Sequence, residues 1–314
     1  MDKFTKYKFL ITVYNVSILI KTDSANLANI LKDELLLSLF LPDFFISLQE
    51  EEKLTSFDYC LTCIQSDEKK VFSNFRRDDF LLLDDWISFN KYNFLAFLLS
   101  LFQSKLILNS IYILHAAAVQ YNDIGLILIG DSGSGKTTSM LELLKIDKGF
   151  KIIGNNRVAI ESKETCVIRG GATGISLRKN MDINEYIDIH GGNHMEIHGG
   201  RKLFRPEYKS SGEFNKIRKI IFIALRLNPG VEEYSDNLGL ENSHLLLYPE
   251  LLGVKDREVV LFNGTQAIPL LYNEYEVKQK VIEDTAKIIN QSEIIRIAGS
   301  LEFITKKIHE LVKI

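Results

Sequence analysis

Proline, cysteine and tryptophan are scarce in this sequence of 314 residues, which holds five prolines, three cysteines and one tryptophan. Because prolines are few and low-complexity tracts are absent, little room remains for a disordered linker. The sequence also lacks an excess of charge of one sign: 38 basic and 41 acidic residues leave a formal charge of −3. Proteins that bind nucleic acid or anionic membranes in general carry a basic excess. We therefore expect neither as a partner.

Long apolar runs are missing as well. The longest strongly apolar stretch, FLAFLLSLF from Phe94 to Phe102, is about half as long as a segment that crosses a bilayer, so we expect a helix of the core. The first residues, MDKFTKYKFLITVYNVSILI, alternate polar with apolar side chains and show no signal-peptide cleavage site. These features predict a soluble protein.

The cysteines offer a single CxxC motif, Cys60 to Cys63, and no second one to complete a zinc site. The surrounding FDYCLTCIQS alternates as a strand does, and residues three apart on a strand point to opposite faces. We therefore interpret Cys60 and Cys63 as buried core residues, with zinc or redox chemistry as the alternative. A low cysteine content is typical of proteins in the reducing cytoplasm, so we expect a cytoplasmic location.

The chain divides into two domains by its patterns. The residues up to about Ser73 read as short strands with a hairpin turning near Asn15 and one amphipathic helix, SANLANILKDELLLSLF, and the stretch LLLDDWISFNKYNFLAFLLSLFQSKLILNS reads as mostly helical. We place the boundary near Asn109, with an N-terminal α+β domain over residues 1–108 and a second domain over 109–314. The first domain would recognise a phosphate acceptor or form a homo-oligomer.

In the second domain, apolar strands flank the turn NDIG, and a glycine-rich loop follows them. The loop, Gly130 to Thr137, satisfies the phosphate-binding pattern GxxxxGK[ST] between an apolar strand and an amphipathic helix. Glycines let successive backbone N–H groups converge on phosphate oxygens, the lysine reaches the β- and γ-phosphates, and the last hydroxyl ligates Mg²⁺. The residues predicted to bind nucleotide are Gly130, Asp131, Ser132, Gly133, Ser134, Gly135, Lys136, Thr137 and Thr138.

Most ATPases and GTPases with such a loop carry an acid at the end of a later apolar strand, and this sequence lacks one after Thr137. Its neighbours are instead His115 in LHAAAV, one hairpin before the loop, and the strand GFKIIGNNRVAI after the loop's helix. Over roughly Ile113 to Ile160 this arrangement resembles the HPr kinase/phosphorylase family, and especially its looser relatives, the HPr-kinase-like serine kinases.

The resemblance implies an α/β fold with α+β elements: a mixed-sheet core like that of phosphoenolpyruvate carboxykinase beside the smaller N-terminal domain. It implies ATP and Mg²⁺ as cofactors and transfer of the γ-phosphate to a hydroxyl, expected to be a serine, of a peptide, a protein or a small molecule. In the family two adjacent acids supply a general base and a metal contact, and here they correspond to Asn155 and Asn156. An amide oxygen can ligate Mg²⁺, with Thr137, but accepts no proton near neutral pH.

His115 is the candidate to take or relay that proton instead, since a neutral imidazole can do so. The alternative is a strand-end histidine hydrogen-bonded to the loop. His115, Lys136, Asn155 and Asn156 are thus the predicted catalytic residues. Losing the base would cost about 10²–10⁴-fold in rate, but phosphoryl transfer depends mainly on positioning and charge stabilisation.

A segment rich in histidine and glycine, IHGGNHMEIHGGRKLFRPEY, follows further along. Equal spacing would place its three histidines on one helix face as zinc ligands, but the paired glycines oppose a helix. We expect a loop near the phosphates, whose cations stabilise the transferred group, or else a solvated basic loop. Its MEIHGG is similar to the EIRG loop of HPr kinase, which implies a role for Glu196. The residues concerned are His190, His194, His198, Glu196, Arg201, Lys202 and Arg205.

The charged stretch FRRDDFLLLDDW, from Phe75 to Trp86, pairs carboxylates as acid–base sites do. Adjacent arginines favour a turn and a helix start instead. Later, IRKIIFIALRL and REVVLFNG read as strands, and two helices close the chain.

The sequence as a whole predicts an ATP-dependent kinase. The alternatives are a nucleotide-binding pseudokinase or sensor that transfers no phosphate, and a GTPase or ATPase switch, which the missing acid disfavours.

Overall fold

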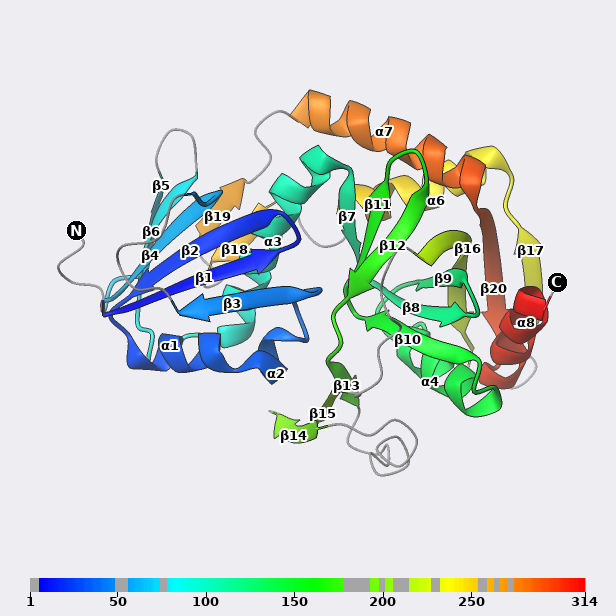
Figure 1. Ribbon diagram of the computed structural model, residues 1–314, viewed down its shortest axis with the longest axis horizontal. Coiled ribbons are helices and arrows are strands. Elements are labelled where there is room, and N and C mark those ends of the chain that lie inside the picture. Colours follow the sequence, from blue (N-terminus) through cyan, green and yellow to red (C-terminus); the bar gives the residue numbers. More distant parts are fainter. Residues whose placement is uncertain are drawn as a thin grey trace. The chain divides into compact units, whose positions relative to one another are not determined.

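The computed structural model describes residues 6–48, 56–73, 78–177, 193–197, 201–205, 215–226, 232–253, 259–262, 266–269 and 274–313. They form two compact units (Figure 1). The first comprises Met1–Asn109 and Arg257–Val277, and the second comprises Ser110–Asp256 and Lys278–Ile314. Both units combine helices with mixed sheets, so the fold is a mixed α/β one with α+β elements.

The first unit is built on a six-stranded sheet in the order β3-β1-β2-β4-β6-β5. The neighbours β2, β4 and β6 run parallel, and the other pairs are antiparallel. The hairpin near Asn15 is confirmed, since Val13 pairs with Val16. The strands are β1 Tyr7–Val13, β2 Val16–Thr22, β3 Phe44–Leu48, β4 Tyr59–Gln65, β5 Lys70–Ser73 and β6 Asp79–Asp84.

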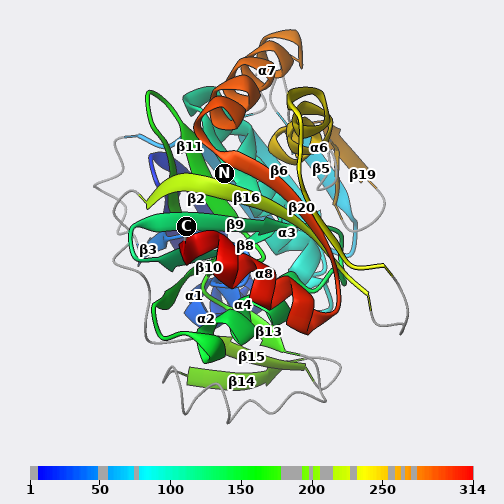
Figure 2. The ribbon, with the colours of Figure 1, turned by 90° about the vertical axis from the view of Figure 1, so that its right-hand side faces the viewer.

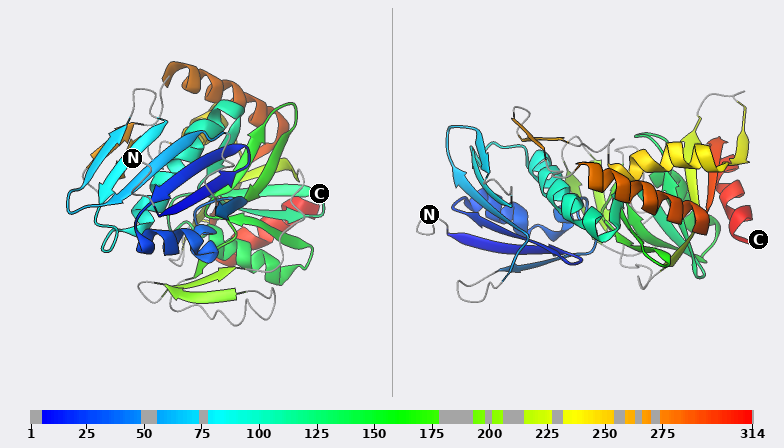
Figure 3. Two further views of the ribbon diagram at one scale, coloured as in Figure 1. Left: turned by 60° about the vertical axis from the view of Figure 1, so that its left-hand side comes forward. Right: turned by 90° about the horizontal axis from the view of Figure 1, so that it is seen from above.

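The helices of this unit differ from the expectation in one respect. The single amphipathic helix is two, α1 (Ala25–Lys32) and α2 (Glu34–Leu37), because Asp33 ends the first and its carboxylate accepts the Leu36 N–H to begin the second. The core helix is confirmed: α3 (Lys91–Leu106) buries the whole apolar run except Ala96 and lies against the sheet (Figure 3). A 3₁₀ turn, Ile107–Asn109, follows it.

The stretch before α3 is a correction. A turn and a helix start were expected between Phe75 and Trp86, whereas Asp79–Asp84 is strand β6 with every second side chain buried. The leucines of this run alternate between the two faces of the sheet, so the period is two rather than 3.6. Asp84 is fully buried and accepts the Asp85 N–H, so it serves the fold.

The second unit is built on a nine-stranded sheet whose main path is β10-β8-β9-β16-β12-β11-β7, with β20 beside β16 and β17 beside β20. Strands β9, β16 and β20 run parallel, and β10 shares their direction because both β9 and β10 are antiparallel to β8. Their carboxyl ends therefore lie at one edge. The strands are β7 Ile111–Leu114, β8 Ala116–Tyr121, β9 Ile124–Ile129, β10 Phe150–Asn155, β11 Val158–Ser162, β12 Cys166–Gly171, β16 Asn215–Leu225, β17 Tyr234–Asn237 and β20 Glu293–Gly299.

A bent antiparallel ribbon is the feature that shapes the site. Strands β7 and β8 pair with β11 and β10 in one register, from Ile111 with Glu161 to Ala117 with Asn155. Each side of the ribbon is interrupted once, at 115 on one side and at 156–157 on the other. The continuous register places residue 115 opposite residue 157. The predicted strand KIIGNNRVAIE is thus two strands joined at a corner.

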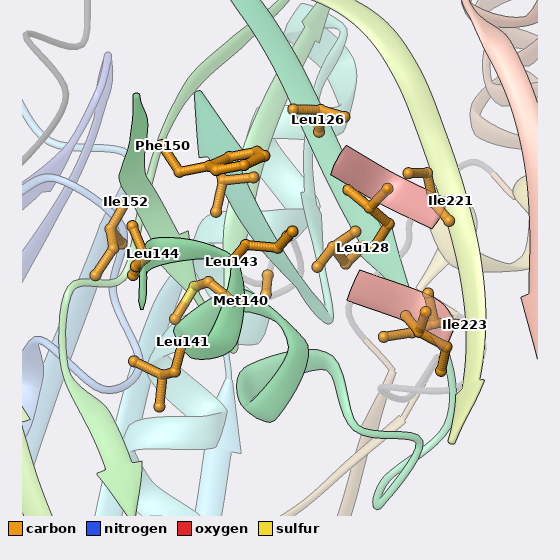
Figure 4. Close-up of a cluster of buried hydrophobic side chains, with 14 of the residues drawn as sticks. Leu126, Leu128, Met140, Leu141, Leu143, Leu144, Phe150, Ile152, Ile221 and Ile223 are labelled. Atoms are coloured by element: carbon orange, nitrogen blue, oxygen red, sulfur yellow. The ribbon is translucent and has the colours of Figure 1, made fainter. Parts of the chain in front are cut away.

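Helices α4 (Lys136–Ile146) and α8 (Leu301–Lys313) lie side by side on one face of this sheet (Figure 2). Buried side chains of α4 pack against those of β9, β10 and β16 (Figure 4). This packing holds the N-terminus of α4, and the loop before it, against the sheet. Helix α7 (Glu274–Gln291) starts in the first unit's residues and continues in the second's. The expectation of two closing helices missed β20 between them, and α6 (Leu240–Leu252) was not expected.

Two small sheets complete the described elements. One joins β13 (Ile175–Leu177), β15 (Arg201–Arg205) and β14 (Asn193–Ile197), and the other is the hairpin of β18 (Val259–Phe262) and β19 (Gln266–Pro269). Because β18 contacts α3, residues 257–277 cluster with the first unit and not with the second domain as expected. Among the described helices, none is both long and apolar enough to cross a membrane.

Candidate functional site

The glycine loop joins β9 to α4 at the carboxyl edge of the second unit's sheet. Gly133 and Gly135 adopt positive φ angles of 86° and 91°, which glycine takes without steric cost. A Cβ on Gly135 would lie 2.8 Å from the Cβ of Leu225 at the end of β16. The Leu225 N–H in turn donates to the Ser134 carbonyl at 2.9 Å. The loop is therefore held against the neighbouring strand and leaves no room for a side chain at 135.

Lys136 begins the helix and folds back over the loop. The residue is buried, with 7% of its surface exposed, and Nζ donates to the carbonyls of Gly130 at 2.6 Å and Asp131 at 3.0 Å. These carbonyls partly compensate the charge of the ammonium group. Nζ lies where the loop's own backbone turns, beside the N-terminus of α4, whose dipole favours an anion.

Thr137 and Asn155 connect the helix to the end of β10. The Thr137 hydroxyl donates to Oδ1 of Asn155 at 2.9 Å. Asn155 is 1% exposed, and its Nδ2 is buried without a hydrogen-bond partner among the described residues. The predicted metal contacts are thus adjacent, and both are neutral oxygens. They can ligate an Mg²⁺ that arrives with phosphates, but they supply no negative charge to hold the ion by themselves.

Asn156 forms the corner of the ribbon. Its φ is 64°, and the Arg157 N–H bonds to the Asn155 carbonyl at 2.8 Å, so the chain turns within three residues. Among non-glycine residues, Asn and Asp tolerate this left-handed conformation best. The backbone conformation alone therefore explains why residue 156 is Asn or Asp, and it does not depend on the side chain being acidic. The side chain is half-buried.

His115 stands opposite this corner and meets an unexpected partner. Nη1 of Arg157 lies 3.3 Å from His115 Nδ1. A guanidinium only donates, so Nδ1 is the acceptor, and the proton of a neutral ring is on Nε2. The register that pairs Ala116 with Ile129 puts His115 beside Gly130. Sequence reasoning missed Arg157; its signal was a lone cation directly after the two asparagines.

The remaining loop residues differ in exposure. The tip is exposed at Asp131, Ser132 and Gly133, Thr138 is half-buried, and Ser134 Oγ is buried without a described partner. The structure brings the loop, Asn155, Asn156 and His115 together at one edge.

The histidine–glycine segment is not as expected. Residues 193–197 and 201–205 are paired strands β14 and β15, not a loop, and Glu196 pairs with Lys202 in their register. The structure does not describe the side chains of His194, Glu196, Arg201 and Arg205, and His190 and His198 lie outside the described residues. Among those that are described, no group of three or more His, Cys, Asp or Glu side chains could hold a metal ion.

The CxxC residues behave as core residues. Cys60 and Cys63 are both buried free thiols on β4, as is Cys166 on β12. Burial raises the pKa of Cys60 to about 11 and raises that of Cys63 as well. Thiolates are therefore scarce at neutral pH, and the buried, unpaired interpretation is confirmed.

A cavity of about 1000 Å³ lies at the far end of the β11–β12 hairpin, away from the glycine loop. It is lined by charged residues that pair with one another: Lys163 and Arg169 both bridge to the buried Glu161. Lys287, also in the lining, bridges to Asp284. The loop edge, where buried polar atoms have no hydrogen-bond partner within the described part of the chain, is the better candidate site.

No protein-family model matches the sequence, and no curated protein matches it. Among solved structures, the Hpr(Ser) kinase/phosphatase from Coxiella burnetii matches over 64% of this chain and 93% of its own, at 9% identity and a TM-score of 0.30. A likeness of this strength does not place the chain in a family.

Proposed function

We propose that the glycine loop binds the phosphates of ATP and that the protein transfers the γ-phosphate to a hydroxyl of a peptide, a protein or a small molecule, expected to be a serine. The observation that carries this is the contact of the Thr137 hydroxyl with Asn155 beside the buried Lys136. Ligands of open α/β sheets bind outside the carboxyl ends of the strands, and this contact lies there.

Each residue has a distinct part in this proposal. The loop amides and the N-terminus of α4 surround the phosphates. Lys136 leaves the carbonyls of its own loop for the β- and γ-phosphates. The Nε2–H of His115 is a donor for a phosphate oxygen. Mg²⁺, bound with the nucleotide through Thr137 and Asn155, would offset phosphate charge.

The residues predicted to be catalytic supply no evident base for the acceptor's proton. Asn155 and Asn156 are amides, and His115 already accepts a hydrogen bond at Nδ1. Transfer through a loose transition state relies on positioning and electrostatics rather than on a strong base. We therefore expect slow transfer, with the first unit recognising the acceptor or joining two copies of the chain.

A second candidate is a nucleotide sensor that transfers no phosphate. The engaged Nδ1 of His115 favours it, because the proposed substitute for the missing acid is then a donor and not a base. Both candidates bind ATP and differ only in turnover.

Binding is tested first, by thermal shift and calorimetry with ATP. Lys136→Ala should lose the response, because the ammonium that meets the phosphates is removed. Lys145→Ala, on the last turn of the same helix and paired with Glu142, should keep it. Absence of any response in the wild type would refute both candidates.

Turnover separates the two. Purified protein and γ-labelled ATP are incubated with serine-containing peptides and extracts of small molecules, and label on a hydroxyl supports the kinase. Asn156→Asp restores an acid at a position whose backbone accepts it. A gain in transfer on this substitution alone would favour the sensor as the native function.

A further inference from the structure

The candidate site lacks the negative charge that an acidic residue beside the loop threonine would add. A carboxylate next to the loop threonine attracts a metal ion, but it also repels the nucleotide's phosphates, so nucleotide and metal bind together. Position 155 here carries a neutral amide, 2.9 Å from the Thr137 hydroxyl and 1% exposed. Nothing at that position repels a metal-free nucleotide.

The positive charges of the site come from side chains of the protein. Lys136 Nζ is held at the loop by two backbone carbonyls that a phosphate can replace. The Arg157 guanidinium is positioned by His115, which the register places beside Gly130. A guanidinium stays charged and suits phosphate oxygens. Two positive side chains of the protein thus lie at this edge, together with one carboxylate, that of Asp131 at the exposed tip of the loop.

We infer that the site binds nucleoside triphosphates without Mg²⁺, with Lys136 and Arg157 supplying the charge compensation that metal ions otherwise give. This inference rests on the proposed nucleotide binding and concerns affinity, not turnover. Mg²⁺ that accompanies the nucleotide is accepted by the oxygens of Thr137 and Asn155 but adds little to binding.

The test is calorimetric titration with ATP in excess EDTA and in excess Mg²⁺. For the wild type we expect dissociation constants within about threefold of each other. In Asn155→Asp a carboxylate faces the phosphates across a few ångströms, so binding in EDTA should weaken by about tenfold or more and recover with Mg²⁺. If Asn155→Asp fails to fold, Asn156→Asp takes its place in the test. Because residue 156 is more exposed, its binding of ATP in EDTA should weaken by a smaller factor.

A matched control adds the same charge elsewhere. Asn122 is exposed in the β8–β9 turn, also at positive φ, and lies at the opposite end of these strands from the loop. Asn122→Asp should leave both dissociation constants as in the wild type. Arg157→Gln should weaken binding in EDTA more than in Mg²⁺, because the metal then replaces the lost charge.

The outcomes separate the two proposals. Binding in neither medium refutes nucleotide binding itself. Wild-type binding that requires Mg²⁺ overturns the metal-independent site and leaves the proposed function standing. An Asn155→Asp variant that folds and binds equally in both media refutes the role given to the amide.

Discussion

Replacing Gly154 by alanine tests whether the corner that carries Asn155 depends on close contact between two strands. A Cβ on Gly154 would lie 2.5 Å from the Cα of Gly171, and a Cβ on Gly171 would lie 2.6 Å from the Cα of Gly154. Both obstacles are backbone, so no side chain can move aside. Carbon atoms in contact stay about 3.5–4.0 Å apart, so the methyl group requires β10 and β12 to separate by about 1 Å.

That separation stretches two short hydrogen bonds, from the Asn155 N–H to the Ala172 carbonyl at 2.8 Å and from the Ala172 N–H to the Arg157 carbonyl at 2.7 Å. Overpacking costs about 1–3 kcal/mol, and each bond contributes about 0.5–1.5 kcal/mol. We expect the free energy of unfolding to fall by about 2–6 kcal/mol. For a unit of this size the melting temperature should drop by roughly 5–20 °C.

The assay is thermal and urea unfolding followed by circular dichroism, together with ATP titration. Gly239→Ala is the matched control, because a Cβ there meets nothing within 4 Å; it should cost about 1 kcal/mol or less, through the helix-cap preference alone. A Gly154→Ala protein as stable as Gly239→Ala, with unchanged affinity for ATP, would refute the account of the corner.

Two further predictions concern stability and thiol chemistry. The Gly149 N–H, together with His309 and Tyr121, lowers the pKa of Asp147 to about 2, so its stabilisation is complete above about pH 4 and is lost as the pH falls toward 2. The stability gap between wild type and Asp147→Asn, measured by urea unfolding, should narrow over that range; a constant gap would contradict this. The three thiols should resist an aromatic disulfide reagent at pH 8 and react after unfolding, since burial raises the pKa of each; rapid native reaction would contradict their burial.

Local patterns predicted the elements whose chemistry is local. The hairpin near Asn15, the helix over Phe94–Phe102 and the buried strand β16 follow from alternation, apolar content and turn residues. The loop from Gly130 to Thr137 lies between strand and helix as its pattern requires. In each case the residues that decide the structure are neighbours in the chain.

The errors arose where distant pairing decides. The leucines of β6 fit a helix as well as a strand until β4 and β5 pair with them. Asparagine is depleted in strands and common in turns, but the corner at Asn156 was missed because the apolar residues on both sides of it fit one continuous strand. The contact of Arg157 with His115 joins residues 42 positions apart, and only the ribbon's register brings them together.

The ribbon that bends at His115 and Asn156 makes the site sensitive to insertions and deletions at two short intervals, as well as to substitutions. Adding or deleting one residue in the β8–β9 turn, or in the turn between α4 and β10, can be absorbed by those turns. One residue gained or lost between Leu114 and Ala117, or between Asn155 and Val158, would shift one side of the ribbon by a residue and turn its side chains to the other face. Either His115 or Arg157 would then point away from the other while every strand remained. In a comparison of distant homologues, the lengths of these two short intervals would therefore carry more information about the site than residue identity does.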